Sequence, residues 1–303
     1  MNLLSGWRSV LALNGQRRSR IIGVLAVLAV AGLLQACSTL KLAYNQTPGL
    51  AYWYLDGHFD FLDTQSLRVK DDLAGLQTWH RKTQLPGYID ALQKLQLQLP
   101  LDITADAACA VFTDVRGKLM AVSEQAEPAV AAVVASLNAG QLVQLERRFA
   151  KGNAEYRGDF MEGTPQDRQG KRVEQLRGRA ERLYGRLGEP QRAVLSQRTA
   201  QSRFDASMLY AEKLRRQQDV LRTLRPLIAG QAAPEKTQAA VRGLFERTLN
   251  PTDPALRQTR NALNDENCAT FAALHNSTTA AQRFHAVQTL QRYEQDFRTL
   301  NAE

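Results

Sequence analysis

Four histidines are the side chains best suited to acid–base or metal chemistry in this chain of 303 residues: His58, His80, His275 and His285. Histidine changes charge near neutral pH and is a common metal ligand. His80 also stands in the triplet Trp79-His80-Arg81, and an arginine can hold a carboxylate or a phosphate through two parallel hydrogen bonds. The chemistry to consider first is therefore hydrolysis with His80 as a base, or the binding of an acidic group.

A structural role is the simpler interpretation of this triplet. Successive side chains on an α-helix point about 100° apart, so Trp79 and His80 do not both face one pocket. No nucleophile motif accompanies them. We therefore favour an arrangement in which Trp79 packs, His80 bonds a carboxylate or carbonyl, and Arg81 pairs with an acid. An envelope hydrolase that uses His80 stays an alternative.

The spacing of the polar residues does not match the common motifs for binding a metal or a cofactor. The histidines show no HExxH pattern. Asp56, His58 and Asp60 alternate, so they would converge on an extended segment but not on a helix. The sequence contains no phosphate loop, nucleophile elbow or glycine-rich dinucleotide turn. We expect no metal, no cofactor and no enzymatic activity.

Cys37 lies where a cysteine can be modified covalently. It follows an uncharged apolar run at 21–34, which is preceded by arginines and followed by the small residue Ala36. The run is about 21 Å long as a helix, short of the roughly 30 Å core of a bilayer, so it is typical of a cleaved signal peptide at 1–36. "LQAC" resembles the lipobox of bacterial lipoproteins, whose cysteine is acylated, with palmitate for example, and becomes the first mature residue. Ser38 in place of aspartate resembles the sorting pattern for the outer membrane.

Export would place the other two cysteines in an oxidising compartment. Cys109 and Cys268 each precede a phenylalanine by three residues, which places cysteine and aromatic ring on one helical face. In an oxidising compartment such a pair predicts a disulfide. Its loop of about 160 residues corresponds to a stabilisation of about 5 kcal/mol on the chain-entropy model. Two separate buried thiols remain the alternative.

Five arginines recur at intervals of 4, 7, 3 and 4 and would share one face of a helix: Arg168, Arg172, Arg179, Arg182 and Arg186. Their stems can cover the edge of the core while the guanidinium groups reach water. They can also bind an anionic partner, such as membrane phosphates or acidic proteins. The pI near 9.7 would suit nucleic acid, but export argues against that partner. The candidate interaction surface consists of Trp79, His80, Arg81, Arg172, Arg179 and Arg186.

Helical periodicity dominates the sequence behind the signal, and no alternating strand pattern appears. We expect an all-α bundle of roughly eight to ten helices. Residues 37–63 form a tether with a short helix, and residues 64–303 form the helical domain, with a possible sub-boundary near 156–170. The proposed helices include one beginning at Pro128, a long one over about 190–228, and three at 234–249, 254–275 and 278–300.

Three helix starts share a glutamine placed soon after the first residues, in "SLNAGQLVQL", "RLGEPQRAVL" and "STTAAQRFHAV". A glutamine three residues after a capping residue satisfies exposed backbone donors, and this capping chemistry is the favoured explanation. The pattern also resembles the L-T-x-x-Q elements of periplasmic helical chaperones of the Spy and CpxP type, although none of the three shows the full motif.

Two blocks, "LAYNQTPGLAYWYLDGHFDFLDTQ" and "WHRKTQLPGYIDAL", resemble a family of uncharacterised Gram-negative lipoproteins, known as a domain of unknown function. The resemblance lies in Tyr-Asn after the lipidated cysteine, aromatic-Leu-Asp, an aspartate–glutamine segment, Trp-His-Arg, and Leu-Pro-x-Tyr. These fall on Tyr44 and Asn45, Tyr54 to Asp56, Asp60 to Gln65, Trp79 to Arg81, and Leu85 to Tyr88. The resemblance implies an exported lipoprotein and supplies no activity.

We therefore expect a lipoprotein anchored in the outer membrane through acyl chains on Cys37 and facing the periplasm. It would act as a non-enzymatic binding or scaffold module for an envelope protein or an anionic surface, without nucleic acid. The alternatives that also involve no enzymatic reaction are a chaperone-like and a metal-responsive helical protein.

Overall fold

The computed structural model describes residues 39–303, which contain helices and no strand. The expected signal peptide and Cys37 lie outside the described residues. Contacts between Cα atoms divide the chain into one unit ending at Gln46 and a second at Thr47–Glu303. Of the first unit, the described part is α2 (Thr39–Asn45).

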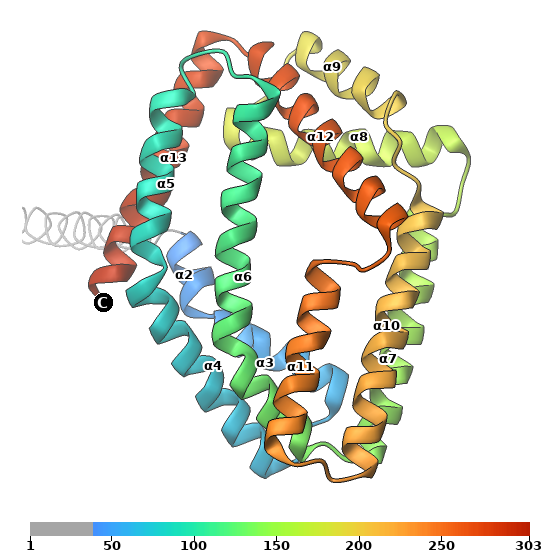
Figure 1. The fold of residues 1–303 in the computed structure, drawn as a ribbon. Coiled ribbons are helices and arrows are strands. Elements are labelled where there is room, and N and C mark those ends of the chain that lie inside the picture. The colour runs from blue at the N-terminus through green and yellow to red at the C-terminus, as the bar shows by residue number, and fades with distance from the viewer. Residues whose placement is uncertain (1–38) are drawn as a thin grey trace, which may run out of the picture. The chain divides into compact units, whose positions relative to one another are not determined.

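Eleven helices build this unit (Figure 1). They are α3 (Thr47–Phe59), α4 (Asp63–Thr83), α5 (Leu85–Gln98), α6 (Ala105–Ser136), α7 (Ala139–Phe160), α8 (Pro165–Tyr184), α9 (Glu189–Ala200), α10 (Ala206–Ala229), α11 (Pro234–Leu249), α12 (Pro254–Asn276) and α13 (Ala280–Ala302). The all-α prediction is confirmed, but the expected count of eight to ten helices is too low, since the described residues form twelve with α2.

One long helix, predicted over about 190–228, is two helices. The chain leaves helical conformation between Ala200 and Ala206, where Ser202 Oγ and the Arg203 N–H both donate to Glu266 of α12 at 3.0 Å. Asp205 then caps α10 by accepting from the Ser207 N–H at 2.8 Å. A residue on a distant helix thus stabilises the break, which explains why local periodicity did not predict it.

Pro128 does not begin a helix, as the sequence suggested; it lies inside α6. A proline in a helix interior removes one backbone hydrogen bond and crowds the preceding turn. The helix continues because α6 packs against α4, α10, α11 and α12, so tertiary contacts outweigh the local cost.

The proposed sub-boundary near 156–170 contains the end of α7, a turn at 161–164 and the start of α8. Thr164 caps α8, because its Oγ1 accepts from the Asp167 N–H at 3.2 Å and Asp167 accepts from the Thr164 N–H at 3.0 Å. The compact unit extends through this range.

Two clusters of buried side chains form the core. One joins α5, α8, α9, α12 and α13 through Leu99, Tyr184, Leu187, Leu195, Leu274, Ala286 and Leu290. The other joins α6, α7, α10 and α11 through Ala131, Val134, Leu142, Leu145, Leu224, Leu227 and Val241. The helices α7 and α10 run side by side, and so do α5 and α13 (Figure 1).

Glutamines near helix starts connect the loops in pairs. Gln141 accepts from the Asn138 N–H at 3.1 Å and donates to the Asp60 carbonyl at 3.2 Å, while Gln65 donates to the Ser136 carbonyl at 2.7 Å. The α3–α4 and α6–α7 loops are therefore tied to each other in both directions. The capping role predicted from sequence is present, and each amide also bridges to a second loop.

Among residues 39–303, no single helix is long and apolar enough to cross a membrane. The pair α6 and α7 passes that test together, but the chain bends by 115° between them.

Candidate functional site

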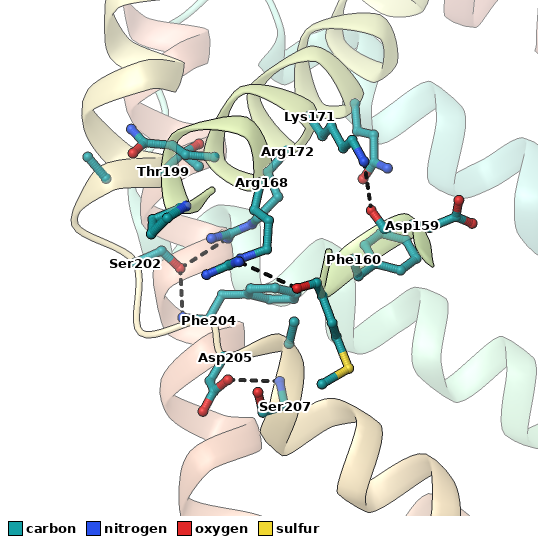
Figure 2. A pocket seen from close by; sticks show the side chains of 16 residues that line it. Asp159, Phe160, Arg168, Lys171, Arg172, Thr199, Ser202, Phe204, Asp205 and Ser207 are labelled. Atoms are coloured by element: carbon teal, nitrogen blue, oxygen red, sulfur yellow. Dashed lines mark hydrogen bonds between the residues drawn. The ribbon is translucent and has the colours of Figure 1, made fainter. Parts of the chain in front are cut away.

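Three cations of α8 gather at one cavity of about 370 Å³ (Figure 2). Arg168, Lys171 and Arg172 recur at intervals of three and one, so they lie on adjacent turns of the same helix face. The end of α7, the end of α9 and the start of α10 supply the other walls. Its volume lies within the range of roughly 300–1,000 Å³ that small-molecule sites occupy.

Arg172 is held between an aromatic ring and a hydroxyl. Its guanidinium carbon lies 4.0 Å from the centroid of the Phe204 ring, and its Nη2 donates to Ser202 Oγ at 3.3 Å. Burial lowers the pKa of the Arg172 guanidinium, and the charge of Glu266 opposes that shift. An arginine nevertheless keeps its charge at any physiological pH, so this is a partly desolvated cation on an aromatic surface.

Arg168 forms hydrogen bonds with the turn between α7 and α8. Its Nη1 donates to the Gly163 carbonyl at 2.7 Å and, more weakly, to the Met161 carbonyl at 3.4 Å. Lys171 reaches the carbonyl oxygen of Asp159 at 3.5 Å. Figure 2 shows the Asp159 carboxylate turned away from the two arginines.

The residues that line the cavity carry one net positive charge, and the Glu266 carboxylate acts on Arg172 from outside the lining. The lining contains three cations and the two acids Asp159 and Asp205. The Asp205 carboxylate already accepts a hydrogen bond from the Ser207 N–H at the start of α10. The cavity can therefore accept a ligand carrying a carboxylate or phosphate, for which guanidinium and ammonium groups are the usual donors.

The five arginines that the sequence placed on one helix face differ in their surroundings in the structure. Arg168 and Arg172 are half-buried at the cavity, whereas Arg179 and Arg182 are exposed further along α8. Arg186 lies beyond the end of α8 at Tyr184 and is not on that helix face. Gly185, with φ of 73°, turns the chain there in a conformation that suits glycine.

The Trp79-His80-Arg81 triplet lies at the end of α4 and is half-buried. His80 Nε2 forms a hydrogen bond with Tyr88 Oη at 3.1 Å, and Arg81 pairs with Glu303 at 3.4 Å. The predicted pairing of Arg81 with an acid is therefore present, and the hydrogen bond of His80 to the Tyr88 hydroxyl is a contact that the sequence did not predict. Burial lowers the pKa of His80.

These contacts give the block "WHRKTQLPGYIDAL", which carries the family resemblance, a structural role. Leu85 is fully buried, and Pro86 lies in the first turn of α5, which directs the chain back after α4. Tyr88 then meets His80 and also contacts Phe297 of α13, with ring centroids 6.0 Å apart. The block thus joins α4, α5 and α13, and the structure places it away from the cationic cavity.

Cys109 of α6 and Cys268 of α12 form a disulfide, with their Cα atoms 5.2 Å apart. Phe112 and Phe271, three residues after each cysteine, meet edge to face with centroids 6.2 Å apart. The sequence had placed each cysteine and its phenylalanine on one face, and the structure has them in that arrangement.

Two of the other histidines, His275 and His58, form hydrogen bonds with neighbouring groups. His275 is fully buried between Tyr184 Oη and the Leu101 carbonyl, each 2.8 Å from a ring nitrogen. His58 bonds the Tyr54 carbonyl within α3. Across residues 39–303, no three side chains of the metal-binding types converge.

Sequence reasoning missed Lys171, Ser202 and Phe204 as parts of the cavity. Lys171 could have been found from its spacing to Arg168. Ser202 and Phe204 enter the site only because the chain breaks after α9, and the sole local signal for that break is the capping Asp205.

Comparison with known proteins identifies a family. Residues 57–239 match the family of unknown function DUF6279. No curated protein and no solved structure matches the chain. The match extends from α3 into α11 and includes the whole of α8 with its cavity. The chain belongs to this family of unknown function.

Proposed function

We propose that this protein is a lipoprotein of the outer membrane that faces the periplasm and binds an acidic envelope partner. It recognises this partner without any chemical reaction, as a binding or scaffold module. The observation that carries this proposal is the gathering of Arg168, Lys171 and Arg172 at one cavity.

The anchoring part of the proposal rests on the amino-terminal sequence and on α3. The apolar run, Ala36 and Cys37 form the expected signal and lipidation site. A short distance along the chain, α3 presents Leu50, Trp53 and Tyr54 to solvent, with Trp53 73% exposed. Their spacing of three and one places them on one helix face. Tryptophan and tyrosine favour the interface between membrane and water, so this face suits a lipid surface.

The binding part rests on charge and shape. The Arg172 guanidinium has lost part of its hydration and lies on an aromatic ring. A ligand anion can therefore replace the lost hydration with an ion pair and hydrogen bonds. Lys171 is exposed and its hydrogen bond to the Asp159 carbonyl is long, at 3.5 Å, so it can turn toward a ligand that enters the cavity. A carboxylate or phosphate on a protein or on an envelope polymer has the required chemistry.

A pair of charge-matched variants tests the binding site. Lys171→Gln/Arg172→Gln removes two charges from the cavity, and Arg179→Gln/Arg182→Gln removes two charges from the exposed part of the same helix. We expect the wild-type protein to bind poly-L-glutamate or pyrophosphate in a salt-sensitive manner. The cavity variant should lose at least about tenfold in affinity, corresponding to about 1.4 kcal/mol, and the control should lose much less. Equal losses would assign binding to general surface charge.

A chaperone-like protein is the second candidate, and the paired glutamines favour it. Gln141, Gln191 and Gln282 occur in the elements that resemble those of small periplasmic helical chaperones, and each connects two loops. Suppression of the aggregation of an unfolded client by stoichiometric amounts of protein would support this function. Unchanged aggregation, together with specific acidic binding, would support the scaffold.

A further inference from the structure

An apolar cavity of about 490 Å³ lies between α3, α4 and α6, separate from the cationic site. Leu55 and Phe59 of α3 and Phe61 of the following loop form one wall. Val69, Leu73 and Leu76 line it from α4, and α6 contributes residues between Gln125 and Leu137. Within this unit, α4 packs against both α3 and α6 (Figure 1).

Small side chains keep this cavity open. Ala126 and Ala129 line it on α6, where Pro128 also lies, and Gly75 lines it on α4. A Cβ added at Gly75 would meet no atom within 4 Å. Tight helix packing normally fills such space, so a cavity with these walls is suited to an apolar ligand.

The charged groups that line the cavity come from one helix. Arg68, Asp71 and Asp72 of α4 line it together. The Asp72 Oδ2 atom is buried and accepts no hydrogen bond from the described residues. Its nearest cation is Arg68, whose Nε lies 3.7 Å away and whose side chain is 61% exposed. An ion pair of this length with an exposed arginine is weak. The Asp72 side chain is 33% exposed, so the accessible part of its carboxylate can accept from a further donor.

We propose that this cavity binds a small amphiphile with an apolar body and a cationic head, such as an alkylammonium. The apolar body would occupy the space beside Gly75, and the head would donate to Asp72. The charged residues that line the cavity are two carboxylates and one guanidinium, so a cation is favoured over an anion. The site does not depend on the proposed binding of acidic partners, because its residues and its charge preference differ.

The test uses the chain from Ser38 onward, exported with a cleavable signal so that its disulfide forms and no detergent is needed. This chain contains every described residue, and Thr47–Glu303 carries both core clusters and the disulfide. Calorimetric titration with octylamine, octanol and octanoate compares three heads on the same apolar body. We expect octylamine to bind at least tenfold more tightly than octanoate, with octanol between them.

Two glycines on helices provide matched variants. Both glycines are exposed, and a Cβ added at either meets nothing within 4 Å. Gly75→Leu places a side chain at the wall of the cavity, whereas Gly117→Leu places one on a part of α6 that does not line it. Gly75→Leu should weaken all three ligands at least tenfold, and Gly117→Leu should bind as the wild type does. Thermal melting establishes that both variants are folded.

Asp72→Asn tests the head group separately. It should preserve the affinity for octanol and reduce the preference for octylamine over octanoate by at least fivefold. Octanoate binding as tightly as octylamine to the wild type would overturn the proposal, and so would undiminished binding by Gly75→Leu. A preference that Asp72→Asn leaves intact would overturn the role of Asp72.

Discussion

Gln191 and Gln282 each lie in the first turn of a helix, and each donates a hydrogen bond to the loop that precedes the other helix. Gln191 of α9 donates to the Ser277 carbonyl, and Gln282 of α13 donates to the Arg186 carbonyl at 2.9 Å. The same amides also cap their own helices, because Gln191 accepts from the Gly188 N–H and Gln282 from the Thr279 N–H. The two loops are therefore joined reciprocally at the end of the unit where Leu187 and Leu195 are buried.

Gln191→Ala should destabilise the protein by about 1–3 kcal/mol. Gln191 is 3% exposed, and its removal leaves the Gly188 N–H and the Ser277 carbonyl without this partner. Chemical denaturation provides the measurement. Gln197→Ala, at an exposed position of the same helix, should change the free energy of unfolding by less than about 0.5 kcal/mol. Equal effects of the two substitutions would contradict the bridging role.

The reciprocal arrangement also predicts coupling. In a double-mutant cycle with Gln191→Ala and Gln282→Ala, the two losses should differ from a simple sum by about 0.5 kcal/mol or more, because both act on one pair of loops. Additive losses would show that each glutamine only caps its own helix.

The disulfide between Cys109 and Cys268 should be a large contributor to stability. It joins residues separated by 159 positions, and the chain-entropy model gives about 5 kcal/mol for a loop of that length. Cys109→Ala/Cys268→Ala should therefore melt well below the wild type. A reducing agent should lower the melting temperature of the wild type and leave that of the variant unchanged. Labelling by a maleimide before reduction would contradict the presence of the bond.

His275 should make stability depend on pH in the weakly acidic range. Burial lowers its pKa below the ordinary value of 6.5, the Leu101 carbonyl and Asp102 oppose that shift, and Arg283 adds to it. The unfolded chain therefore binds a proton at His275 before the folded chain does, so the free energy of unfolding falls as the pH drops below about 6.5. Thermal melts between pH 7.5 and 5.5 should show this decrease.

His275→Gln provides the comparison. It should be less stable than the wild type at pH 7.5, because the contacts with Tyr184 and Leu101 change. Its stability should also fall less steeply toward pH 5.5. A slope equal to that of the wild type would assign the pH dependence to other groups.

Much of the secondary structure could be predicted from sequence, because capping and periodicity act locally. Thr104 accepts from the Ala107 N–H at the start of α6, as its position before an apolar stripe indicates. The helix proposed at 234–249 matches α11, and the next two differ from α12 and α13 only at their ends. Each carries its own start signal.

The errors occur where a distant residue decides the local structure. Pro128 remains helical because α6 is held by several neighbouring helices, and the break after α9 depends on Glu266 of α12. The same limit applies to the candidate site. Arg168 and Arg172 could be paired from their spacing, but Phe204 reaches Arg172 only through that break. The apolar cavity beside Gly75 depends on how α4 and α6 pack, which spacing alone does not specify.

Trp53 should report contact with lipid. Its side chain is 73% exposed, so Trp53→Ala should change stability by less than about 0.5 kcal/mol. In a Trp79→Phe background, the fluorescence of Trp53 should shift to shorter wavelength when the acylated protein is reconstituted in vesicles, and brominated lipids should quench it. Emission that stays typical of water would place α3 away from the membrane surface.

The central claim is that acyl chains on Cys37 fasten this helical module to a membrane. Mass spectrometry of the amino-terminal peptide from the native protein tests it most directly. We predict a chain that begins at Cys37, carries the mass of attached fatty acids and is recovered with the outer membrane. A chain that begins at Met1, or one that begins elsewhere without fatty acid, would contradict the claim.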